Sequence, residues 1–155
     1  MKIMKIMDVL HEMGYSVSSY DDEYFLIDVS DIAEKFGILF KSCYYIFVEV
    51  KERDDTFKVS VCISVPDEYD LKEDIAIELA RMRGIKFSDV LDIYWEHQDI
   101  VEEAEKICDK IAYQIIMDIA KGMKCSIASS RWNSTYNVWE FDLKEVGNES
   151  GNKME

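Results

Sequence analysis

The chain has 155 residues, 48% hydrophobic and 12% aromatic, which is enough apolar material for a folded domain and excludes a wholly disordered chain. Its 32 acidic and 18 basic residues give a formal net charge of −14, which disfavours direct binding to nucleic acid or anionic membranes. The same charge favours a protein partner with a basic surface. The sequence has neither a signal-peptide pattern nor an apolar run long enough to cross a bilayer, so we expect a cytoplasmic protein.

The first part of the chain predicts a helix, a hairpin and a short helix. Apolar residues recur at helical spacing over residues 2–13 and end at Gly14, which can stop the helix. Alternating apolar residues then predict a β-hairpin within residues 15–29, and capping residues predict a short helix over about residues 30–37.

The next segment, residues 43–65, has the clearest hairpin pattern in the chain. A loop centred on Asp54 and Asp55 would place Val48 opposite Val61 on a face made of β-branched side chains. We expect this face to belong to the core, because its neighbours along each strand are polar or mixed.

A further helix follows, and after it comes an ambiguous segment. Asp70 resembles the start of a capping box, and an apolar stripe runs from it to a stop at Gly84. Residues 88–97 have the propensity of a strand, although Ser88 could also cap a helix. We favour a strand there and keep the helix as the alternative.

The last third predicts the longest helix and a final hairpin. Apolar residues recur every three or four positions over residues 99–121, and Gly122 follows as a stop. Residues 124–131 and 136–143 predict two strands that turn at residues 132–135.

Together these elements predict an α+β class, with an antiparallel sheet built from hairpins and three or four helices packed mainly on one face. We expect one domain over residues 1–146 and a disordered polar tail over 147–155. Residues 6–19 resemble residues 116–129 at six identical positions, which fits either a duplication or chance. The order of elements is broadly similar to that of small secretion-chaperone-like domains, a likeness that implies a chaperone role and dimerisation.

The best catalytic candidate is the sequence Glu49-Val50-Lys51 on the polar side of a predicted strand. It resembles the local pattern of PD-(D/E)XK nucleases, in which two carboxylates hold a divalent metal and the lysine assists the attacking water. The resemblance implies a phosphodiesterase that uses Mg²⁺ or Mn²⁺, with Asp28 as the second carboxylate. The alternative is a solvated ladder of charges, because strand alternation places Glu49 and Lys51 on one face in any case.

Our leading hypothesis is a non-enzymatic binding or regulatory protein without a cofactor. Its acidic clusters could imitate the charge of a nucleic acid and so block a basic target, or the protein could serve as a small chaperone-like adaptor. Dimerisation through the long helix is a third possibility. The binding residues that we predict are Asp21, Asp22, Glu23, Asp54, Asp55 and Trp132.

Overall fold

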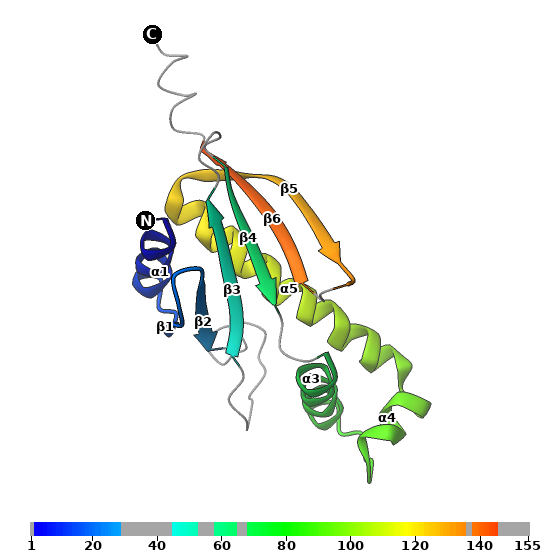
Figure 1. The fold of residues 1–155 in the computed structure, drawn as a ribbon. Helices are drawn as coiled ribbons and strands as arrows, with labels where there is room; N and C mark the ends of the chain where they lie inside the picture. Colours follow the sequence, from blue (N-terminus) through cyan, green and yellow to red (C-terminus); the bar gives the residue numbers. More distant parts are fainter. Residues whose placement is uncertain (1, 29–44, 53–57, 65–67, 136–137, 146–155) are drawn as a thin grey trace.

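The computed structural model describes residues 2–28, 45–52, 58–64, 68–135 and 138–145 (Figure 1). Its helices are α1 (Lys2–Glu12), α3 (Glu68–Met82), α4 (Val90–Glu96) and α5 (Gln98–Met123). Its strands are β1 (Val17–Ser19), β2 (Tyr24–Asp28), β3 (Tyr45–Glu52), β4 (Lys58–Ser64), β5 (Cys125–Asn133) and β6 (Val138–Glu145). The short helix predicted over residues 30–37, the predicted loop at Asp54 and Asp55, and the predicted tail lie outside the described residues.

The strands form one six-stranded sheet in the order β1-β2-β3-β4-β6-β5, and every neighbouring pair is antiparallel. The predicted α+β class and the sheet built from hairpins are therefore confirmed. The two edges differ, because β1 has three residues and β5 has nine.

One face of the sheet is buried against α1 and α5, and Figure 1 shows α5 crossing behind the strands. Apolar side chains alternate onto this face, as the sequence predicts for a half-buried strand. They are Phe25 and Ile27 on β2, Ile46, Val48 and Val50 on β3, and Phe141 and Leu143 on β6. Helices α3 and α4 pack on α5, so the prediction that three or four helices pack mainly on one face of the sheet is not confirmed.

Helices α1 and α5 approach each other closely at Gly122. A Cβ atom at this position would lie 2.0 Å from Cγ1 of Val9 on α1. Gly122 was predicted to stop the long helix, but α5 continues to Met123 and ends at Lys124, which has a left-handed φ of 56°. The glycine therefore marks a point of close helix packing inside the last turn of α5.

The predicted register of the central hairpin is wrong by two residues. Val48 is the Cα partner of Ile63, and Val50 is the partner of Val61. A shift by two residues keeps each side chain on its predicted face, because the side chains of a strand alternate with period two. This explains why the face of β3 was predicted correctly while its partners were not.

The favoured strand over residues 88–97 is also wrong, because this segment contains helix α4. Asp89 caps the helix, and its carboxylate accepts a hydrogen bond from the backbone N–H of Leu91. Asp92 returns the capping-box contact by accepting from the backbone N–H of Asp89 at 3.2 Å. This local capping overrides the strand propensity of the aromatic and branched residues that follow.

Two element boundaries also differ from the prediction. Helix α3 starts at Glu68, two residues before the predicted cap at Asp70. Trp132 was placed in a turn, but it lies inside β5, where it is the Cα partner of Trp139. Strand β5 therefore extends two residues beyond the predicted end at residue 131.

The two similar segments, residues 6–19 and 116–129, have the same local course. Each runs from the end of a helix into an edge strand of the sheet. Gly14 and Lys124 occupy equivalent positions, and both have left-handed backbones, with φ of 97° and 56°. The sequence similarity thus corresponds to one repeated helix-to-strand connection.

Candidate functional site

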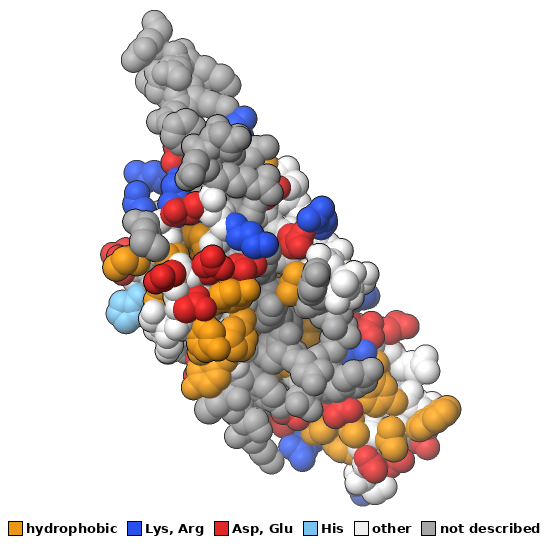
Figure 2. Space-filling view, viewed as in Figure 1, with side chains coloured by type: hydrophobic (Ala, Val, Ile, Leu, Met, Phe, Trp, Pro, Cys, Tyr) orange, Lys and Arg blue, Asp and Glu red, His pale blue; other side chains and the backbone are white. Residues whose placement is uncertain are grey.

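The face of the sheet opposite α1 and α5 is here called the open face, and its described side chains on β2, β3 and β6 are half-buried or exposed. Figure 2 looks onto this face and shows hydrophobic side chains over the β1–β3 side, with acidic side chains beside them. The open-face residues on the described parts of β2, β3 and β6 are Tyr24, Leu26, Asp28, Tyr45, Phe47, Glu49, Lys51, Val138, Glu140, Asp142 and Lys144. The open face divides into an aromatic half and a polar half.

The aromatic half is centred on Tyr20, in the turn between β1 and β2. Its ring lies edge-on to Phe47, with centroids 5.5 Å apart, and edge-on to Tyr24, with centroids 6.5 Å apart. Leu26 on β2 is the cross-strand partner of Phe47 on β3, and Tyr45 lies on β3 two residues before Phe47. Although these rings contact one another, Tyr20 is 62% exposed and Phe47 is 39% exposed.

Three predicted binding residues, Asp21, Asp22 and Glu23, lie in the turn beside this aromatic cluster. The carboxylate of Asp21 accepts hydrogen bonds from the backbone N–H groups of Glu23 and Tyr24, both at 2.8 Å. The carbonyl of Glu23 accepts from the backbone N–H of Val50 at 2.9 Å, which ties the turn to β3. Asp21 thus holds the turn in place, and the exposed side chains of Asp22 and Glu23 supply charge to its surface.

Glu49 connects the acidic turn to the strands. It accepts a hydrogen bond from the phenol of Tyr24, and this bond, assisted by partial burial and the neighbouring carboxylates, raises the pKa of Tyr24 to about 12. The ammonium of Lys51 lies 3.4 Å from Oε1 of Glu49. Glu49 is therefore held by two neighbours on the same face.

The predicted catalytic set is only partly brought together. Glu49 and Lys51 are neighbours, but the cross-strand partner of Glu49 is Tyr24, which lies four residues along β2 from Asp28. This spacing separates Asp28 from Glu49 by about 13 Å, too far for both to bind one metal ion. Among the described residues, no group of three or more His, Cys, Asp or Glu side chains is placed to hold a metal.

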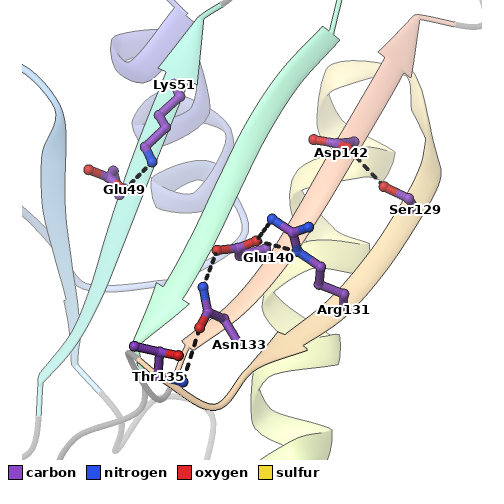
Figure 3. A network of polar contacts seen from close by, with 8 residues as sticks. All are labelled: Glu49, Lys51, Ser129, Arg131, Asn133, Thr135, Glu140 and Asp142. Carbon is purple, nitrogen blue, oxygen red and sulfur yellow. Dashed lines mark hydrogen bonds and ion pairs between the residues drawn. The ribbon is translucent and has the colours of Figure 1, made fainter.

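The polar half of the open face is a ladder of cross-strand pairs on β5 and β6 (Figure 3). Glu140 accepts a hydrogen bond from the amide of Asn133 at 3.0 Å and forms an ion pair with Arg131. Both contacts lower the pKa of Glu140, with the Asn133 bond contributing most. Asp142 accepts from the hydroxyl of Ser129 at 2.8 Å. These carboxylates are matched by their own neighbours, which is typical of a stabilising ladder.

The remaining predicted binding residue, Trp132, lies far from the acidic turn. It is on β5, four strand positions from β2, which corresponds to about 19 Å across the sheet. It also faces the helix side, where its ring lies 5.6 Å from that of Trp139. Trp132 therefore does not share a surface with Asp21–Glu23.

The sequence did not point to Tyr20 and Phe47 as site residues. For Phe47 the sequence does contain an indication. On the solvent-facing side of β3, Tyr45 and Phe47 are aromatic where polar side chains are expected. Tyr20 carries no such signal, because its contact with Phe47 depends on how the turn folds over the strand.

Among the described helices, none is both long and apolar enough to span a membrane. Comparisons with models of protein families, with curated proteins and with solved structures find no match to the chain.

Proposed function

We propose that the protein is a non-enzymatic binding protein whose open face receives a protein partner with a basic surface. The contact region, here called the acidic aromatic patch, consists of Tyr20, Asp21, Asp22, Glu23, Tyr24, Leu26, Tyr45, Phe47 and Glu49. The observation that carries the proposal is the exposed aromatic cluster around Tyr20 and Phe47, bordered by carboxylates.

The patch has two features expected of a protein interface. Aromatic side chains are enriched among the residues that dominate binding energy, because they bury a large area with little loss of side-chain freedom. The hydrogen bonds of Asp21 and Glu23 fix the turn before binding, so less conformational entropy is lost when a partner docks. A net charge of −14 would raise the association rate of a basic partner.

The aromatic content favours an adaptor or chaperone-like role over pure imitation of nucleic-acid charge. A surface that replaces a phosphate backbone works mainly through charge, so its affinity falls steeply as salt screens that charge. A patch centred on Tyr20 and Phe47 retains an apolar contribution at high salt. We therefore expect salt to slow association more than it speeds dissociation of the complex.

A comparative pull-down followed by calorimetry tests the proposal. Proteins retained by the tagged wild-type chain would be compared with those retained by a Tyr20→Ser/Phe47→Thr variant. Threonine maintains strand propensity at position 47. Trp95→Ala is the control, because it removes an exposed aromatic ring from α4, away from the open face, and keeps a good helix former. A partner purified from the wild-type sample would then be titrated by calorimetry.

We expect the partner to have a basic surface, to be retained by Trp95→Ala and to bind the double variant at least about tenfold more weakly. Equal retention by the double variant and the wild type would overturn the proposal. So would a partner whose binding depends on Trp95 alone.

A further inference from the structure

The edge strand β5 differs from the rest of this acidic chain in charge. Residues 119–139 contain neither Asp nor Glu, so all 32 acidic residues lie outside a stretch that includes the whole of β5. From Cys125 to Ser130 the strand has no charged residue, and Arg131 is paired with Glu140. This is the edge at which two copies of the chain can approach with least repulsion.

The same edge also has the backbone of a pairing site. Among the described strands, β5 pairs only with β6, which leaves its other side as a nine-residue sheet edge. Natural proteins commonly protect such edges with charges, proline, β-bulges or shortness. The opposite edge, β1, is short at three residues, whereas β5 is long and has neither an unpaired charge nor a proline. Its one irregularity is a register shift against β6 between Ile127 and Ser129, with regular pairing on both sides of it.

Exposed apolar side chains line the helix side of this edge. Ile127 and Trp132 point to that side, since their cross-strand partners are the core residue Leu143 and the half-buried Trp139. Below them, the hydroxyl of Tyr113 on α5 lies 3.4 Å from that of Ser130. Met117, one helical turn beyond Tyr113 on the same side of α5, is 57% exposed.

We infer that β5 pairs antiparallel with β5 of a second copy, forming a homodimer with one continuous twelve-stranded sheet. A two-fold axis normal to the sheet keeps α1 and α5 of both copies on one side and both open faces on the other. It also brings Met117, Ile127 and Trp132 of one copy towards those of its partner, as an isologous interface requires. The strand supplies backbone hydrogen bonds, and the apolar rim adds the area that a nine-residue edge alone lacks.

The inferred dimer does not depend on the proposed function. Added salt should have opposite effects on the two interactions, which allows them to be tested separately. Screening weakens the attraction of the acidic aromatic patch for a basic partner. Two copies of charge −14 repel each other, so the same screening strengthens their association. Sedimentation equilibrium of the full chain at about 50 mM and about 500 mM NaCl would therefore show a tighter dimer at the higher salt.

A matched pair of substitutions tests the position of the interface. Met117→Lys adds a charge at the β5 edge, and Met82→Lys adds the same charge on α3 at a side chain of similar exposure, 62%. We expect Met117→Lys and Ile127→Lys each to raise the dimer dissociation constant at least about tenfold, because each change occurs twice in the interface. Met82→Lys should leave it unchanged, and circular dichroism melting would verify that each variant is folded.

Amide hydrogen exchange provides the second measurement. Backbone amides of β5 should become more protected as protein concentration rises, while those of β1 should not. A wild-type chain that remains monomeric at about 100 μM would overturn the inference. It would equally fail if Met82→Lys weakened the dimer as much as Met117→Lys, or if concentration-dependent protection appeared outside β5.

Discussion

Gly122→Ala should destabilise the protein, although the same change in an ordinary helix is stabilising. Replacing an interior helical glycine by alanine normally gains about 1 kcal/mol. Here the new Cβ would lie 2.0 Å from Cγ1 of Val9, and also 3.1 Å from Cβ and 3.2 Å from Cγ2. Optimal carbon contacts are about 3.5–4.0 Å, so one of the two helices must move by roughly 1.5 Å.

Neither the side chain nor helix α1 can move cheaply. Valine has one strongly preferred rotamer in a helix, and α1 is fixed to the core by the buried residues Ile3, Ile6 and Leu10. We place the overpacking cost near 3 kcal/mol, at the upper end of the usual range of about 1–3 kcal/mol. The net loss of unfolding free energy is then about 2 kcal/mol, which lowers Tm by about 4–8 °C for a chain of this size.

Urea unfolding of a double-mutant cycle with Val9→Ala tests this reasoning. In the Val9→Ala background both Cγ atoms are gone and only the 3.1 Å contact with Cβ remains, so Gly122→Ala should destabilise the protein much less than it does in the wild type. The coupling between the two substitutions should exceed about 1 kcal/mol. A Gly122→Ala variant with a higher Tm than wild type, or additive effects in the cycle, would show that α1 and α5 are not in close contact at this point.

Two further predictions concern the open face and the end of α5. Glu49→Gln should lower the pKa of Tyr24 from about 12 towards 10.0, which titration of tyrosinate absorbance measures, with Tyr24→Phe to assign the signal. Because folding raises this pKa, the stabilisation from the bond is fully present below pH 10.0 and is lost as the pH rises through about 12. Lys124→Gly should raise Tm by about 2–4 °C, because glycine adopts φ of 56° without the roughly 1 kcal/mol cost of a side chain. Lys121→Gly, inside α5, should lower Tm by a similar amount, and a fall in Tm for Lys124→Gly would contradict the assigned conformation.

The sequence predicts the helices and strands whose apolar residues recur with a clear period. The prediction fails where one residue type has two structural roles, as glycine can both end a helix and allow close packing. The apolar stripes of α1 and α5 and the alternation of β3 each reveal both an element and its buried face. A glycine after a stripe predicts a stop, yet Gly122 provides space for Val9 instead. The contact between two helices distant in sequence is not encoded in the local pattern of either one.

The site is harder to predict than the fold for a related reason. Glu49 and Lys51 were singled out correctly as neighbours, because strand alternation is a local rule. The distance between Glu49 and Asp28 depends on the register of β2 against β3, which apolar patterns fix only to within two residues. The clustering of Tyr20 with Phe47 depends on that register and on the course of the turn as well.

The repeated helix-to-strand connection leads into both edges of the sheet, and the two edges differ in length and in charge. At Gly14 and Lys124 the same left-handed turn leads a helix into an edge strand, β1 on one side and β5 on the other. Strand β1 ends after three residues, and the acidic aromatic patch begins in the turn that follows it. Strand β5 continues for nine residues and extends the sheet without adding an acidic side chain. The proposed basic partner and the proposed second copy thus use different edges of the sheet, so we expect substitutions to remove either interaction without loss of the other.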